Sequence, residues 1–174
     1  MVESGKSKLL LPIKLCHSLI MSYLTGNFEC KLDPKSRMMI PAGLKKKLPE
    51  IENEGIVINC GFKNNLVIYT KSQWDKRLDE LGKLNEFDED SADFIRYFTS
   101  GATELTLDAA GRVLIPKFLL EHAGIKSDVM LTCQLNKVEV WDAEVYKSTY
   151  LKMPKDFAAL AQKVLGSKAG RDNE

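Results

Sequence analysis

The chain has 174 residues, of which 44% are hydrophobic, and a net charge of +1. This length allows one compact domain, or two small domains that share a core. The near-neutral charge excludes binding to nucleic acid through overall charge alone, so such a function has to rest on local patches. Four cysteines and two histidines without CxxC spacing favour reduced, buried thiols in a cytoplasmic protein. We expect no metal and no cofactor.

Residues 1–21 are expected to form an N-terminal extension. Its apolar run, LLLPIKLCHSLIMSYL at residues 9–24, is interrupted by Pro12, Lys14 and His17. The run is too short to cross a bilayer, and no small-residue cleavage site follows it. We therefore expect neither membrane insertion nor secretion.

The next feature is a repeated motif. LDPKSRMMIP at residues 32–41 returns as LDAAGRVLIP at residues 107–116, with a constant offset of 75 residues. Identical residues spaced in this way predict an internal duplication. We expect a first repeat over residues 22–100, a second over residues 101–155, and a C-terminal helix and flexible tail over residues 156–174. Each repeat has too few short strands to bury its faces alone, so two copies are expected to complete one barrel.

Each repeat begins with a strand, a tight turn, a strand and a short helix. The segment Asp33–Ser36 has the signature of a type I turn. Pro41 and Pro116 fit the first position of the short helices, and Gly124 fits a left-handed helix end. Two hairpins should follow, with strands at 55–60 and 65–70 in the first repeat and at 129–134 and 137–142 in the second.

The remaining elements are helical. Ser72 with Asp75 resembles a capping box, and the apolar residues after it predict a helix. Another helix is expected over about residues 90–100, and the last two should begin after Asp142 and after Asp156. Seven aromatic residues are expected in the core, namely Phe28, Tyr69, Trp74, Phe94, Tyr97, Phe98 and Trp141.

The charged residues are unevenly distributed. Residues 31–47 carry six basic side chains and one acidic one, whereas residues 84–93 carry five acidic side chains and no basic one.

Arg37 and Arg112 each follow the tight turn at equivalent positions. Arginine can donate two parallel hydrogen bonds to guanine, lysine such as Lys35 can neutralise phosphate, and a two-stranded element fits the major groove. The alternative is a hairpin kept for packing, in which Asp33 caps the turn and pairs with Arg37. The lysines at 45–47 suit either a phosphate contact or a solvated helix end.

The sequences GNFECKLDPKSRMMIPAGL and GATELTLDAAGRVLIPKFL, followed by KVEVWD, resemble the MraZ family over about residues 21–155. The resemblance implies a mixed α+β fold in which two tandem swapped-hairpin, AbrB-like β-barrel repeats form an intrachain pseudo-dimer with flanking helices. It also implies a cytoplasmic, nucleoid-associated transcriptional regulator that assembles into a ring. Such a regulator binds short G-rich boxes in double-stranded DNA at the promoter of the division and cell-wall gene cluster. The DNA-binding residues would be Asp33, Lys35, Arg37, Asp108 and Arg112.

Two other classes of function are less consistent with the sequence. The same barrel family includes antitoxin-type interaction modules, whose mark would be a long tail that folds on a partner. The tail after Val164 is short and mostly polar, which argues against that alternative. We expect no enzyme, because the chain shows no Ser/His/Asp arrangement, phosphate-binding loop or metal cluster, and His122 suits a helix end.

Overall fold

The computed structural model describes residues 23–166, so the predicted N-terminal extension and the last part of the tail lie outside the described residues. The first repeat contains β1 (Asn27–Lys31), β2 (Arg37–Met39), α1 (Ala42–Lys47), α2 (Ile51–Glu54), β3 (Ile56–Cys60), β4 (Leu66–Thr70), α3 (Lys71–Leu81) and α4 (Glu89–Ser100). The second contains β5 (Thr103–Leu105), β6 (Arg112–Leu114), α5 (Lys117–Ala123), β7 (Asp128–Gln134), β8 (Lys137–Asp142) and α6 (Ala143–Thr149), and the C-terminal helix α7 (Phe157–Gly166) follows it. With α7 counted as the counterpart of α4, the order of elements is the same in both halves of the chain, except for the short helix α2.

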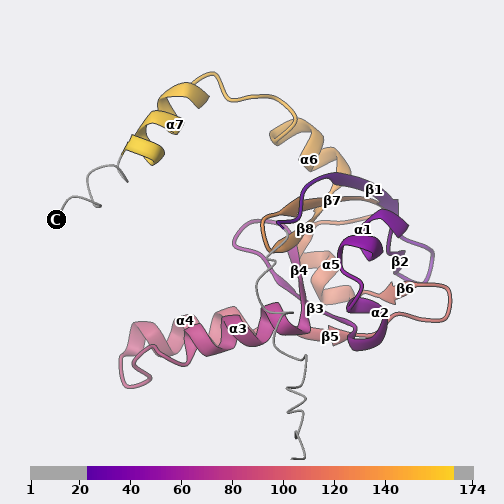
Figure 1. Ribbon diagram of the computed structural model, residues 1–174, viewed down its shortest axis with the longest axis horizontal. Coiled ribbons are helices and arrows are strands. Elements are labelled where there is room, and N and C mark those ends of the chain that lie inside the picture. The colour runs from indigo at the N-terminus through magenta and orange to yellow at the C-terminus, as the bar shows by residue number, and fades with distance from the viewer. Residues whose placement is uncertain (1–22, 167–174) are drawn as a thin grey trace, which may run out of the picture.

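The strands of the two repeats are interleaved in antiparallel sheets (Figure 1). One sheet has six strands in the order β1-β7-β8-β4-β3-β5, and the other pairs β2 with β6. Exchanging each strand for its counterpart in the other repeat reverses the six-stranded order and leaves the two-stranded sheet, called the ribbon below, unchanged. The topology is thus pseudo-two-fold, with the axis between β4 and β8.

The expected closed barrel is not confirmed. Within residues 23–166, β1 and β5 form the two edges of the larger sheet, and no ladder joins them. The ribbon strands pair with each other and cover the core as a separate layer. Their side chains Met38 and Val113 are fully buried and belong to the same core as Ile68 and Val138 from the central strands.

Helices lie against the outer face of the six-stranded sheet. Trp74 of α3 packs with Tyr69, and Phe98 of α4 stacks on Trp74 with ring centroids 5.8 Å apart. Tyr146 of α6 packs in the same way with Trp141 of β8. Figure 1 shows α3 and α4 as an arm that projects from the body, and α7 standing apart at the end of a long linker. No helix in the described part of the chain is long and apolar enough to cross a membrane.

The prediction for the aromatic residues is partly wrong. Tyr69, Trp74 and Trp141 are buried, but Phe94 and Tyr97 are 42% and 75% exposed. The reason is that α4 contacts the sheet mainly through its C-terminal end, where Phe98 lies. The rest of the helix extends beyond the body with its apolar residues in solvent.

Helix ends also differ in detail from the expectation. The capping box of α3 is formed by Thr70 and Gln73, two residues before the predicted pair. Pro41 and Pro116 lie at the N-cap, with ψ of 139° and 140°, one residue before the first helical position. The left-handed end at Gly124 is confirmed, with φ of 63°.

Candidate nucleic-acid interface

The ribbon presents one buried face and one exposed face. In the antiparallel register, Arg37 lies opposite Leu114 and Met39 lies opposite Arg112. Because side chains alternate along a strand, these four side chains share the outer face, while Met38 and Val113 point into the core. The two arginines are diagonal neighbours, a relation that separates residues by about 7–8 Å. The structure therefore brings the two predicted arginines together on one surface.

Each arginine is preceded by a turn that an aspartate holds in shape. The carbonyl oxygen of Asp33 accepts a hydrogen bond from Ser36 N at 2.9 Å, and its Oδ1 accepts from the backbone N of Lys35 and of Arg37, each at 2.9 Å. In the second repeat, Asp108 makes the equivalent bonds to the backbone of residues 110–112. The predicted turns are confirmed, and the aspartate is their structural centre.

The same aspartates hold the arginine side chains. Asp33 Oδ2 accepts from Arg37 Nε at 2.7 Å and lies 2.6 Å from Nη2. Asp108 Oδ2 accepts from Arg112 Nε at 2.9 Å and lies 2.8 Å from Nη2. Because the planar guanidinium donates two hydrogen bonds to one carboxylate, the pair fixes the orientation of the arginine side chain in addition to the attraction between the charges. The spacing of Asp and Arg in the repeated motif is explained by this clamp.

These hydrogen bonds lower the pKa of both aspartates. The side-chain hydrogen bond from Arg37, together with those from the backbone, lowers the pKa of Asp33 to about 2. The backbone hydrogen bond from Arg112 is the largest of the effects that lower the pKa of Asp108 below its usual value. Both carboxylates therefore stay ionised at neutral pH, and both arginines keep their partners.

The clamp leaves part of each arginine available. A guanidinium has five N–H groups, and the aspartate uses one edge, Nε and one hydrogen of Nη2. The end formed by Nη1 and Nη2 remains a pair of parallel donors, which is the geometry that guanine O6 and N7 accept. The side chains of Arg37 and Arg112 are 30% and 32% exposed. The hydrogen bonds to aspartate thus leave the outer end of each arginine available to a hydrogen-bond acceptor.

The predicted lysines divide into two groups. Lys35 is exposed in the first turn, next to the arginine surface. Lys45 Nζ lies 3.4 Å from Glu52 Oε1, and Lys47 Nζ donates a hydrogen bond to the carbonyl oxygen of Thr25 at 2.8 Å. The run at 45–47 is therefore partly engaged within the protein, and Lys35 is the better candidate for a phosphate contact.

Sequence reasoning missed two residues of this surface. Leu114 lies opposite Arg37 and Met39 lies opposite Arg112 on the outer face, and about half of each of these apolar residues is exposed. The alternation within RMMI and RVLI, in which every second residue after the arginine faces outward, was the signal that could have identified them.

Comparison with known proteins gives the family. The family model described as "MraZ protein, putative antitoxin-like" matches residues 23–97 and again residues 98–166. The chain belongs to the MraZ family. Relatives named "Transcriptional regulator MraZ" match most of the length of this chain. The one from Christiangramia forsetii is 40% identical over 148 residues, covering 84% of this chain and 96% of its own length. The protein from Cytophaga hutchinsonii is 36% identical over 145 residues, with 83% and 96% covered. The protein from Flavobacterium psychrophilum is 38% identical over 148 residues, with 84% and 94% covered.

These matches confirm the resemblance inferred from the duplicated motif. The MraZ model matches in two tandem segments, in agreement with the two interleaved repeats. Among residues 23–166 there is no group of three or more His, Cys, Asp or Glu side chains arranged to hold a metal ion.

Proposed function

We propose that the chain is a sequence-specific DNA-binding regulator of transcription that reads double-stranded DNA through its ribbon. The observation that carries the proposal is the pair Arg37 and Arg112, which share one exposed face and are each held side-on by an aspartate. A two-stranded ribbon fits the major groove. The diagonal of about 7–8 Å is close to two base steps of about 3.4 Å along one strand. The name of the relatives supports regulation of transcription.

Contacts to bases and to phosphates have separate roles in this proposal. The free ends of the two arginines donate to guanine, because only a fork of parallel donors discriminates guanine well. Asp33 and Asp108 act as positioning residues that aim these forks. Lys35, exposed beside Arg37, contacts phosphate and adds affinity without discrimination between sequences.

The target and the assembly follow from the family resemblance and from the repeat. We propose that the protein binds short G-rich boxes at the promoter of the division and cell-wall gene cluster, in the cytoplasm at the nucleoid. We also propose that chains associate head to tail into a ring, as heterologous contacts do when the rotation closes. Ring assembly would place many ribbons on neighbouring boxes at high effective concentration.

The test is a footprint of the purified full chain on the DNA upstream of its own gene. We expect protection of short, evenly spaced boxes that contain guanines about two base steps apart, which matches the separation of the two arginines. DNA of the same composition with the boxes scrambled is the control. Uniform protection of both DNAs, or protection of neither, would contradict sequence-specific binding.

The alternative is an interaction module of the antitoxin type. The family description includes the word antitoxin-like, and α7 has no buried residue. This alternative predicts that a different protein binds α7 in a fixed ratio. Co-purification of such a partner, together with equal affinity for cognate and scrambled DNA, would favour it over the regulator.

A further inference from the structure

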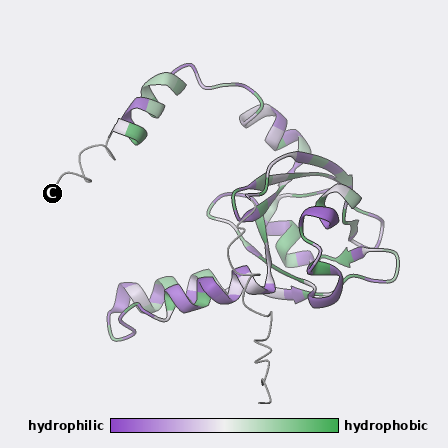
Figure 2. Ribbon diagram, in the orientation of Figure 1, coloured by the Kyte–Doolittle hydropathy of each residue, from purple (hydrophilic) through white to green (hydrophobic). Residues whose placement is uncertain are grey.

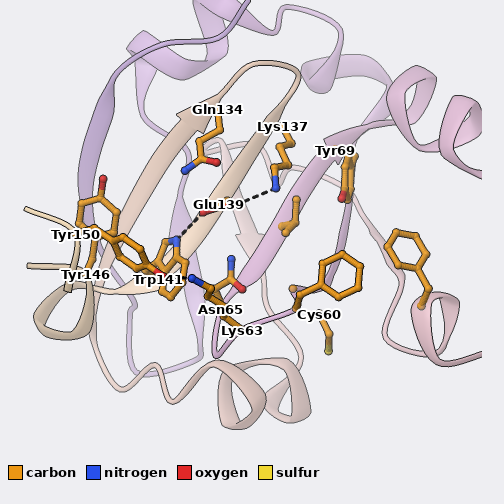
Figure 3. A pocket seen from close by; sticks show the side chains of 14 residues that line it. Cys60, Lys63, Asn65, Tyr69, Gln134, Lys137, Glu139, Trp141, Tyr146 and Tyr150 are labelled. Atoms are coloured by element: carbon orange, nitrogen blue, oxygen red, sulfur yellow. Dashed lines mark hydrogen bonds and ion pairs between the residues drawn. The ribbon is translucent and has the colours of Figure 1, made fainter. Parts of the chain in front are cut away.

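A groove lies on the outer face of the six-stranded sheet, opposite the ribbon. Its volume is about 510 Å³. One wall contains Tyr146 and Tyr150, which gather around Trp141 (Figure 3). The opposite wall contains Phe62 and Phe98, whose ring centroids are 6.1 Å apart. We call this feature the aromatic groove. Its floor is formed by β4 and β8, the strands on either side of the pseudo-two-fold axis.

The internal repeat shows that one side of this face lacks a helix. In the first repeat, the buried Asn59 donates from Nδ2 to the carbonyl oxygen of Phe98 at 2.7 Å and so fastens the end of α4 to the sheet. Its counterpart is Thr132, because Asn59 pairs with Val67 while Thr132 pairs with the equivalent Glu139. The hydroxyl of Thr132 is buried and has no hydrogen-bond partner among the described residues. A buried polar group without a partner is costly. The second repeat therefore lacks, at Thr132, a helix end that would correspond to the end of α4 at Asn59.

A second buried polar atom lies at the groove itself. Asn65 lines the groove, is only 4% exposed, and has an Oδ1 atom without a hydrogen-bond partner within residues 23–166. Aromatic walls with a few unsatisfied polar groups are typical of a surface that receives a partner. The partner should therefore combine apolar side chains with hydrogen-bond donors.

The helix α7 offers the apolar side chains. It corresponds to α4 in the order of elements, but none of its residues is buried. Phe157, Leu160 and Leu165 are exposed apolar residues along it. Figure 2 shows this hydrophobic colouring on a helix that stands clear of the body. An exposed helix with a row of apolar residues is the usual ligand of a hydrophobic groove.

We propose that α7 of one chain docks in the aromatic groove of a second copy of the chain. The proposal rests on the self-association proposed above and names its contact. A second copy is favoured over the same chain because α7 stands apart from the body of its own chain, at the end of the linker that follows α6 (Figure 1). Tyr150, where the linker begins, lies 4.9 Å from Trp141 between ring centroids and is itself part of the groove wall. The contact joins different surfaces of the two copies, so it repeats from chain to chain and leaves every ribbon free for DNA.

Crosslinking tests the location and the origin of the helix. A photoreactive benzoylphenylalanine replaces Leu160 in the full chain, and equal amounts of nitrogen-14 and nitrogen-15 chains are mixed, dissociated in mild denaturant and reassembled. After irradiation, mass spectrometry is expected to find crosslinks to peptides from residues 60–69 and 134–150, with about half of the pairs of mixed isotope for random exchange between copies. Crosslinks of single isotope only, which mean docking within one chain, would overturn the proposal, as would crosslinks confined to other surfaces.

Assembly mass tests the energetic role of the helix. Leu160→Asp places a charge in the apolar contact and is expected to raise the dissociation constant of the assembly more than about tenfold. Ala159→Asp is the matched control, because this residue is exposed on the opposite side of α7 and should leave the mass measured by light scattering unchanged. If the unmodified chain is a monomer, self-association itself is refuted. If the unmodified chain assembles and Leu160→Asp assembles equally well, only the docking of α7 is refuted.

Discussion

Ser36 occupies a backbone conformation that suits glycine. Its φ is 61°, and its counterpart in the second turn is Gly111 with φ of 76°. The left-handed conformation costs a residue with a β-carbon about 1–2 kcal/mol, while the extra freedom of glycine in the unfolded chain offsets about 0.5–1 kcal/mol. Ser36→Gly is therefore expected to raise the free energy of unfolding by about 0.5–1 kcal/mol. The replacement keeps the backbone hydrogen bond that the Ser36 carbonyl accepts from Ile115 N at 3.0 Å.

Urea titration and thermal melting measure this change. For a chain of this size, about 1 kcal/mol corresponds to roughly 2–4 °C in melting temperature. The reciprocal change, Gly111→Ser, should lower stability by a similar amount, since the new β-carbon would meet the flexible ends of Lys45, 3.1 Å away, and of Met39, 3.9 Å away. Ser148→Gly inside α6 is a control that should destabilise, because glycine is a poor helix former. A loss of stability in Ser36→Gly would refute the argument from backbone strain.

Three further predictions concern the carboxylate of Asp33, the hydrogen bond that holds α4 on the sheet, and the phosphate contact of Lys35. Because Arg37 holds the pKa of Asp33 at about 2, below the usual 3.8, its stabilising contribution is complete above about pH 4 and is lost as the pH falls toward 2. Asp33→Asn should remove this part of the acid sensitivity in urea titrations across that range; an unchanged pH profile would contradict it. Asn59→Ala should cost about 1–3 kcal/mol and speed hydrogen exchange in α4, whereas unchanged exchange would show that the bond to Phe98 does not fasten the helix. Lys35→Ala should weaken binding to cognate and scrambled DNA alike and reduce the salt slope by about one; a loss confined to cognate DNA would make Lys35 a base reader.

The local geometry of the motif could be predicted from the sequence. Asp33 and Asp108 stand at the start of turns because a short carboxylate can accept backbone N–H groups two and four residues later. Gly111 predicts a left-handed position, and the shared offset transfers that conformation to Ser36. The duplication also predicted that strands of the two repeats would interleave, since neither repeat has enough strands to bury a face alone.

Features that depend on tertiary packing could not be predicted in the same way. Thr70 with Gln73 and Ser72 with Asp75 have the same spacing, and only the position where β4 ends selects the first pair. The exposure of Tyr97 depends on how far α4 extends past the sheet. The absence of a β1–β5 ladder among the described strands likewise reflects how far the sheet curls, which composition and periodicity do not encode.

The central claim is that the ribbon arginines discriminate guanine-containing sites. Its most direct test is the ratio of affinities for cognate and scrambled promoter DNA, measured by fluorescence anisotropy for Arg37→Lys combined with Arg112→Lys. Lysine keeps the charge and loses the fork of parallel donors, and each fork contributes about 1–3 kcal/mol of discrimination. The ratio should therefore fall at least about tenfold, while affinity for scrambled DNA changes little. Arg77→Lys on α3, an exposed arginine 2.9 Å from a carboxylate, is the control and should keep the full ratio. An unchanged ratio in the double variant would contradict base reading by the ribbon.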